Sequence, residues 1–198
     1  MLKTKLNFND FPELAEYLLN NCVFKVKNNL FRICEIEFYY FGDDHEDQYV
    51  HCNDDQLENG KIYFHKMKNS YKSGTFKGMD IALSNGKSYF GVLIRALYDL
   101  ENKIMINGPS KSVDKVLEIL GFHNVLSLME SRNFKLIDIN SNDDIEIKDH
   151  VYDVTEKIYC GTRIGLSDKY PEYKIKEYRF VIMKKLVKKE IRKLKEFR

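Results

Sequence analysis

The chain has 198 residues and a formal net charge of +2, and 43% of its residues are hydrophobic. This length fits one domain, and this apolar content is enough for a substantial core, which excludes a disordered tail. No apolar run approaches the roughly 20 residues of a membrane span, and the N-terminus lacks the apolar core of a signal peptide. We therefore expect a soluble, intracellular protein with no membrane partner, and any case for a nucleic-acid partner rests on where the charges lie.

Residues 10–22 predict the first helix. Asp10 is suited to the N-cap, Glu13 completes a capping box, and Pro12 is tolerated in the first turn. One face carries apolar side chains at helical spacing, which we expect to pack in the core. These are Phe11, Leu14, Ala15, Leu18, Leu19 and Cys22.

The strand predicted over residues 31–40 carries two carboxylates, Glu35 and Glu37. Aromatic and β-branched residues dominate this segment, which contains neither Gly nor Pro. Side chains alternate across a strand, so both glutamates face the same way. Glu37 lies among apolar neighbours near the strand end, where partial desolvation would raise its pKa towards a value useful for a general base. The alternative is that both are solvated carboxylates on an exposed face.

Charge is then divided between two neighbouring segments. Residues 43–58 hold seven acidic side chains and no Lys or Arg, whereas residues 61–77 hold five Lys and no acid. This contrast predicts two fields of opposite sign on one surface.

A hairpin is predicted over residues 66–74, between strands over residues 61–65 and 75–83. Its tip would carry an aromatic side chain flanked by cations: Tyr71, Lys68 and Lys72. The segment is therefore predicted to be a basic hairpin with an aromatic side chain at its tip.

Residues 88–98 are nearly all apolar apart from Arg95, which predicts a strand covered on both faces. A buried guanidinium needs partners, because removing it from water unpaired costs several kcal/mol. Two interpretations stay open: a structural ion pair, for example with Glu35, or a donor aimed into a site.

The rest of the chain predicts further helices and one more strand. We expect helices over residues 110–121, with Ser110 as N-cap and Gly121 as terminator, over 124–131 and over 181–197, an exposed loop over 141–149, and a strand over 151–160. The last helix would carry a basic outer face, which is either solvated or in contact with phosphates.

Metal and thiol chemistry are not favoured by the residue spacing. The four cysteines, Cys22, Cys34, Cys52 and Cys160, show no CxxC spacing and are expected to be reduced, mostly buried thiols. His45, His51, Cys52 and His65 are irregularly spaced, and no predicted helix presents two of them at i, i+4. We therefore predict no metal site.

Several segments resemble motifs of the alkyladenine (3-methyladenine) DNA glycosylase family, in the same order across residues 31–180. The run Arg32-Ile-Cys-Glu-Ile-Glu-Phe-Tyr39, followed by His51, is similar to the family's RIVETEAY…H segment. Gly60-Lys-Ile-Tyr-Phe-His65 resembles its GTLYVY strand, Val92-Leu-Ile-Arg-Ala96 its VLLRA strand and Gly108-Pro-Ser-Lys111 its GPSK helix start. Arg163-Ile-Gly165 and Tyr178-Arg-Phe180 resemble its late RIG and RF elements.

The resemblance implies one mixed α/β (α+β) domain over residues 1–198, built on a curved antiparallel sheet with surrounding helices. It implies a monofunctional DNA repair hydrolase without metal or cofactor, which flips alkylated or damaged purines, such as 3-methyladenine or 7-methylguanine, out of double-stranded DNA and releases them. We expect a monomer. The acidic segment 43–58 is shorter than the family's equivalent, and the hairpin is longer.

Carried over residue by residue, the resemblance makes Glu37 the catalytic base and Arg95 the partner that supports the catalytic water. The pocket residues would be Tyr39, His51, His65 and Asp80. The DNA contacts are predicted from the hairpin itself, because wedges that fill the space of an extruded nucleotide are apolar or aromatic and lie among phosphate-binding cations. Tyr71 is the candidate wedge, Met67 is the second choice, and Lys68 and Lys72 are the flanking cations. Asp80 takes the place of the family's Asn, which is thought to crowd the 2-amino group of guanine. An ionised carboxylate accepts hydrogen bonds and donates none, so we expect Asp80 to favour 7-methylguanine over hypoxanthine or ethenoadenine. Alternatively, Asp80 pairs with Arg95 or a hairpin Lys.

Two other functions stay open at the level of the sequence. One is a module of the same fold that binds modified bases without cutting, and the other is a glycosidase of the same fold that acts on RNA or a nucleotide.

Overall fold

We obtained a computed structural model of the chain, which describes residues 8–197 except 43, 69 and 142. In the part it describes, one twelve-stranded antiparallel sheet is combined with four α-helices. The main strand order is β10-β4-β7-β8-β2-β13-β12-β14, and β1, β3, β9 and β11 pair at its sides. The predicted mixed α+β architecture is therefore confirmed.

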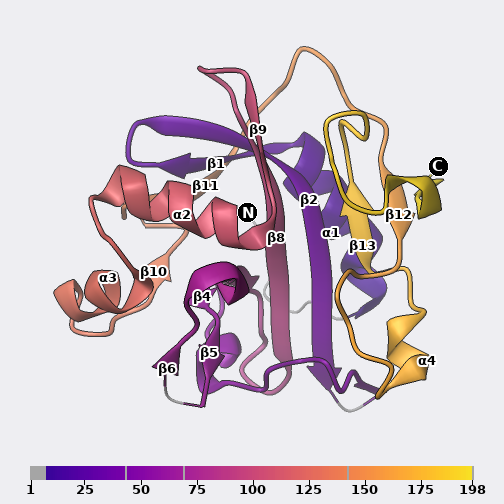
Figure 1. Cartoon of the computed structure of the whole chain (residues 1–198), viewed down its shortest axis with the longest axis horizontal. Helices are drawn as coiled ribbons and strands as arrows, with labels where there is room; N and C mark the ends of the chain where they lie inside the picture. The colour runs from indigo at the N-terminus through magenta and orange to yellow at the C-terminus, as the bar shows by residue number, and fades with distance from the viewer. Residues whose placement is uncertain (1–7, 43, 69, 142, 198) are drawn as a thin grey trace.

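Two long strands, β2 (Asn29–Gly42) and β8 (Tyr89–Asp99), form the centre of the sheet. They pair antiparallel and run side by side through the middle of Figure 1. The first was predicted from its aromatic and β-branched content and the second from its nearly continuous apolar run, and most of their side chains are buried. Together they provide the rigid platform on which the candidate site is built.

The remaining strands are shorter. They are β1 (Cys22–Val26), β3 (His45–Glu46), β4 (Lys61–Phe64), β5 (Lys66–Met67), β6 (Ser70–Tyr71), β7 (Met79–Ala82), β9 (Ile104–Asn107), β10 (Ile137–Asp138), β11 (Ile145–Asp149), β12 (Tyr159–Gly161), β13 (Arg179–Val181) and β14 (Lys195–Glu196). Strands β5 and β6 pair only with each other and form a separate hairpin.

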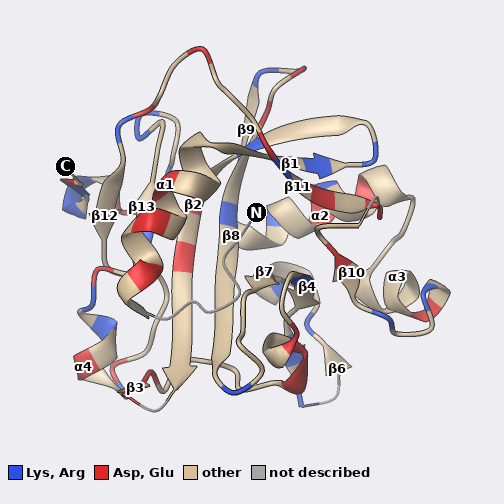
Figure 2. Cartoon of the chain, turned by 180° about the vertical axis from the view of Figure 1, so that it is seen from behind, with Lys and Arg blue, Asp and Glu red and all other residues tan. Residues whose placement is uncertain are grey.

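The two longer helices lie on opposite faces of the sheet, as Figures 1 and 2 show: α2 (Pro109–Leu120) crosses one face and α1 (Phe11–Asn20) the other. All six apolar residues predicted for the first helix are buried, and the Phe11 ring stacks on Phe38 of β2 with centroids 4.4 Å apart. The predicted helix at 124–131 is also present, as α3 (Val125–Ser131).

Short helical turns complete the chain: α4 (Pro171–Lys174) and the 3-10 turns η1 (Phe8–Asp10), η2 (Asp54–Leu57), η3 (Gly74–Phe76) and η4 (Ile191–Lys193). No helix in the described part of the chain is long and apolar enough to cross a bilayer.

The prediction of a helix over residues 181–197 is wrong. Only the two ends of this segment lie in the sheet, in β13 and β14, which both pair with β12, and the 3-10 turn η4 lies between them. Met183 and Glu190 adopt the left-handed conformation, each with φ of 48°, which interrupts a right-handed helix. Of the apolar side chains that suggested the helix, Val187 and Leu194 pack with Val181 in a small separate cluster and Ile191 packs against it. Met183 packs against the main core, and Leu186 is exposed.

Local predictions fail at other places for the same reason. Residues 141–149 do not form the predicted exposed loop, because Ile145–Asp149 forms β11 against β1 and Lys25 pairs with Glu146 at 2.7 Å. Residues 151–160 contribute only the start of β12. Helix α2 begins at Pro109, with Gly108 at the N-cap in place of Ser110. The four cysteines are unpaired, but Cys52 is exposed.

Candidate functional site

The sheet register places polar residues in one row across five strands. The paired positions are Tyr63 with Asp80, Asp80 with Leu93, Leu93 with Glu37, and Glu37 with Arg179. Directly paired residues project from the same face of a sheet. Asp80 and Glu37, which are 43 positions apart in the sequence, therefore lie on one face with only the β8 position between them.

Glu37 is completely buried and is held by three donors. The backbone N–H of Ile164 donates to Oε1 at 2.7 Å, and Oε2 accepts from the Tyr39 hydroxyl at 2.9 Å and from Arg95 Nη1 at 3.2 Å. Burial raises the pKa of Glu37 above its ordinary value, although Arg95 and the Ile164 amide oppose this. A carboxylate has about four acceptor positions, so one remains for a water or a sugar.

Glu35 has a different environment from Glu37. Its Oε1 accepts from Arg95 Nε at 2.9 Å and from Arg179 Nε at 2.8 Å, and all three side chains are buried. Arg95 therefore satisfies both interpretations left open by the sequence, because it pairs with Glu35 and donates to Glu37. Figure 2 shows the acidic part of β2, in red, next to the basic part of β8, in blue.

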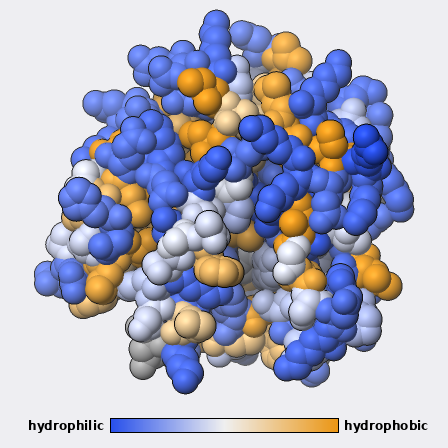
Figure 3. All heavy atoms as spheres, in the orientation of Figure 1, coloured by the Kyte–Doolittle hydropathy of each residue, from blue (hydrophilic) through white to orange (hydrophobic). Residues whose placement is uncertain are grey.

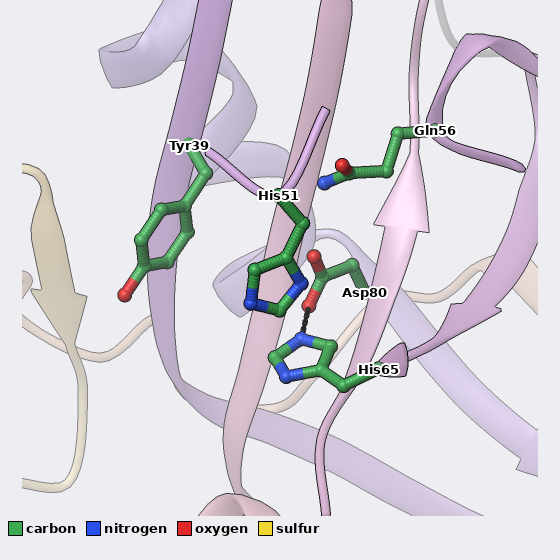
Figure 4. Close-up of a pocket in the computed structure, with 5 residues that line it drawn as sticks. All are labelled: Tyr39, His51, Gln56, His65 and Asp80. Atoms are coloured by element: carbon green, nitrogen blue, oxygen red, sulfur yellow. Dashed lines mark hydrogen bonds and ion pairs between the residues drawn. The ribbon is translucent and has the colours of Figure 1, made fainter. Parts of the chain in front are cut away.

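A small cavity is lined by Tyr39, His51, Gln56, His65 and Asp80, and the hydroxyl of Tyr39 links it to Glu37. Figure 4 shows the two imidazoles and the Asp80 carboxylate converging on one side of it, with Tyr39 on the other. Four of the five lining residues were predicted as pocket residues from the sequence. The cavity volume is about 50 Å³, which holds a few waters but is too small for a purine.

Hydrogen bonds fix the ring orientations in this cavity. His65 Nε2 lies 2.7 Å from Asp80 Oδ1, so Asp80 pairs with His65 and not with Arg95. His51 Nε2 lies 3.3 Å from Lys72 Nζ, and its Nδ1 lies 3.1 Å from the Tyr63 hydroxyl. An ammonium group only donates, so His51 carries its proton on Nδ1 and donates it to Tyr63. Desolvation, with the nearby His65 and Lys72, lowers the pKa of His51 to about 4, so this ring is neutral at pH 7.

Two glycines make room for the cavity residues. A Cβ at Gly78 would lie 2.5 Å from the His65 ring, and a Cβ at Gly91 would lie 2.6 Å from Asp80 Oδ2. Both positions therefore require the absence of a side chain for His65 and Asp80 to reach their observed places. Neither requirement is visible in the sequence, because each contact joins different strands or loops.

Arg163 holds the loop that supplies the Ile164 N–H. Its Nη1 pairs with Asp47 and donates to the Phe38 carbonyl at 3.1 Å, and its guanidinium carbon lies 4.4 Å from the centre of the Tyr39 ring. Neither side chain of the Arg163–Asp47 pair is exposed. The pair therefore positions one donor to Glu37 without contacting the carboxylate itself.

A larger groove, of about 910 Å³, opens on the Arg95 side of Glu37. Figure 3 shows this face, which is hollowed near its centre and surrounded by hydrophilic atoms. Five basic and two acidic side chains line it, and one wall carries Phe76, which is 78% exposed. The charged lining residues are Lys77, Arg95, Lys111, Lys188, Lys189, Glu35 and Asp114.

The structure separates the predicted DNA contacts from this groove. Tyr71 lies in β6, half-buried and with Lys66 over its ring, and not at the tip of the hairpin. Met67 is 70% exposed and Lys68 is exposed on the same hairpin, whereas Lys72 turns towards His51. None of these four residues lines the groove.

Sequence reasoning missed Gln56 and the Ile164 amide, whereas Lys188 and Lys189 of the groove belong to the basic C-terminal segment that was a candidate for phosphate contacts. Gln56 closes a capping box with Asn53 at η2, a spacing that the sequence contains. A backbone amide such as that of Ile164 leaves no signal in side-chain chemistry. In the described part of the chain, no cluster of three or more His, Cys, Asp or Glu has the geometry of a metal site.

Comparison with known proteins gives one informative relative. The chain is 40% identical over 205 residues to the uncharacterized protein L759 of Acanthamoeba polyphaga mimivirus, in a match that covers 96% of this chain and 94% of the relative. The chain belongs to the family of this mimivirus protein. No family model matches the chain. Since the relative is described as uncharacterized, a function for this family is argued from the geometry of the site.

Proposed function

We propose that the protein is a DNA glycosylase that hydrolyses the N-glycosidic bond of alkylated or otherwise damaged purines, with Glu37 as general base. The observation that carries this proposal is the position of Glu37. It is a buried carboxylate whose three donors come from the cavity wall, Tyr39, and from the groove wall, Arg95 and Ile164. A base in the cavity and a backbone in the groove would place the bond that joins them next to this carboxylate.

The chemistry needs one carboxylate and no metal ion. As the bond between the base and C1′ breaks, its electron pair leaves with the base and positive charge develops on the sugar. An ionised Glu37 stabilises that charge and takes a proton from the water that adds to C1′. An alkylated purine is already cationic and departs as a neutral molecule, so no acid is required for that leaving group.

The neighbours of Glu37 support this role. Burial raises the pKa of Glu37 above its ordinary value, which makes the carboxylate a stronger base, and Arg95 opposes this shift by favouring the charged form. Because no part of Glu37 is exposed, the attacking water reaches it only when Tyr39 or Arg95 moves as substrate binds. Closing the site around a flipped base would then exclude other water.

The groove supports a nucleic-acid substrate. Lys111, Lys188 and Lys189 are exposed along its walls and are suited to phosphates. Asn107 fixes the loop that carries two of them, since its Nδ2 donates to the Leu186 carbonyl at 3.1 Å and its Oδ1 accepts from the Lys188 N–H at 3.2 Å. The local charge, rather than the small net charge of the chain, therefore provides the electrostatic attraction.

The decisive experiment incubates the protein with methylated DNA and RNA, each single- and double-stranded, and measures free bases by liquid chromatography and mass spectrometry. We expect release of methylated purines from duplex DNA and none with Glu37→Gln, which preserves the shape of the side chain but cannot take a proton. Lesion binding by Glu37→Gln should stay within about tenfold of wild type.

The same experiment separates the alternatives. Binding to lesion DNA without release of any base would identify a binding module and refute catalysis. Release from RNA alone would move the substrate class to RNA, and equal activity of Glu37→Gln would remove Glu37 from the mechanism.

A further inference from the structure

The floor of the cavity carries two buried polar side chains, Gln56 and Asp80, which are 1% and 2% exposed. Both reach the same point over β8, where Gly91 has no side chain. A Cβ at Gly91 would lie 2.6 Å from Asp80 Oδ2 and 3.1 Å from Gln56 Nε2. Figure 4 shows the amide and the carboxylate directed into the same cavity.

The orientation of the Gln56 amide is fixed by a backbone donor. The N–H of Asn53 lies 3.1 Å from Gln56 Oε1, and a backbone N–H only donates. The atom it meets must therefore be the amide oxygen, which leaves the NH₂ group on the cavity side. The Asn53 side chain completes this capping box by accepting from the Asp55 N–H at 3.1 Å.

The orientation of Asp80 is fixed from the other side. Oδ1 lies 2.7 Å from His65 Nε2, and the His65 ring is packed directly over Gly78. Oδ2 is left to face Gly91 and the Gln56 amide. The cavity floor thus presents a preorganised donor beside a preorganised acceptor.

We propose that Gln56 and Asp80 recognise the Watson–Crick edge of a guanine-type base. This inference rests on the proposed function and names the base that the site prefers. The Gln56 NH₂ group donates to O6, and Asp80 accepts from N1–H and the 2-amino group. An adenine-type edge has no 2-amino group and offers an acceptor at N1, opposite a carboxylate that only accepts. The carboxylate also favours a cationic base, such as 7-methylguanine.

The size of the cavity adds one structural consequence. At about 50 Å³ it does not hold a purine, so a wall must move when the base enters. His51 is the exposed wall, whereas Gln56 and Asp80 are anchored by Asn53 and His65. The base therefore displaces His51 and meets a floor that stays in place.

Two isosteric substitutions test the recognition. Gln56→Glu keeps the oxygen that accepts from Asn53 but replaces the donor on the cavity side, and Asp80→Asn replaces an acceptor oxygen with NH₂. Gln48→Glu, at an exposed position outside the cavity, is the matched control. The measurements are single-turnover release of 7-methylguanine and 3-methyladenine from methylated duplex DNA, and calorimetric titration of each free base.

In both measurements we expect each cavity variant to lower the preference for 7-methylguanine by about tenfold or more, the usual effect of a lost hydrogen bond to a charged or buried group. Gln48→Glu should leave the preference unchanged. Unchanged ratios in both cavity variants would overturn the inference while base release continued to support the glycosylase. If no base is released from any nucleic acid, the calorimetric titrations still test whether Gln56 and Asp80 recognise a guanine-type base. A 7-methylguanine preference that both variants lose supports the recognition without the hydrolysis, and no preference overturns it.

Discussion

Glu35 and Glu37 should respond in opposite ways to the same substitution. Glu35 accepts from Arg95 and Arg179 with one oxygen, so Glu35→Gln leaves the buried Arg179 guanidinium without its carboxylate partner and Arg95 with Glu37 alone. Removing one partner of a buried ion pair costs about 3–5 kcal/mol. For a chain of this length each kcal/mol lowers Tm by about 2–4 °C, so the expected loss is roughly 6–20 °C.

Glu37→Gln should cost far less stability while abolishing base release. Burial raises the pKa of Glu37, which means that folding favours its neutral form over its charged form. A neutral amide keeps an oxygen for the Ile164 N–H, and the Tyr39 hydroxyl can turn to accept from the new NH₂ group. Arg95 Nη1 loses its acceptor, but Arg95 keeps its charged partner Glu35. We expect the free energy of unfolding to change by less than about 2 kcal/mol.

Thermal denaturation at pH 7, followed by circular dichroism, and the base-release assay measure the two effects separately. In wild type, activity should fall on the acid side at a pH above the ordinary Glu value of 4.5, because the base must be ionised. Equal destabilisation by both substitutions would show that Glu37 is another structural ion and refute the reasoning. An inactive, stable Glu35→Gln with an active Glu37→Gln would show that the site assignment is two residues out.

Three further outcomes can be measured. The sequence predicts that Tyr71→Ala weakens duplex binding by roughly 1–3 kcal/mol, whereas the exposure of Phe76 beside the groove predicts the same loss for Phe76→Ala. Mobility-shift assays with duplex and single-stranded DNA compare the two variants. A variant that loses equal affinity for both substrates has lost a structural side chain rather than a wedge. The pKa of His51 is lowered from 6.5 to about 4, so its contribution to stability is present above pH 6.5 and is lost as the pH falls towards 4. Tm should therefore fall more steeply over that range in wild type than in His51→Gln, and parallel curves would contradict this. Arg163→Lys should loosen the Ile164 donor, raise the pKa of Glu37 and move the acid limb of activity to higher pH; an unmoved limb would limit Arg163 to a structural role.

The sequence by itself determined the elements whose signal is local. The alternating strand around Glu37, the apolar strand around Arg95 and the first three predicted helices form as their patterns predict, because side-chain periodicity acts within a few residues. The resemblance also selected four of the five residues that line the cavity. Such local signals were enough to place both glutamates on one face.

Only the tertiary structure decided how these elements combine into a site. Strand register sets Asp80 in one row with Glu37, and Arg95 acquires both carboxylates only because β2 and β8 pair. The predicted C-terminal helix did not form, because only the two ends of the segment pair with β12 and the left-handed residues Met183 and Glu190 lie between them. These tertiary constraints outweigh the small helix propensities of its residues. Gln56 and the Ile164 amide entered the site through contacts between distant segments, and such contacts depend on packing that no local pattern encodes.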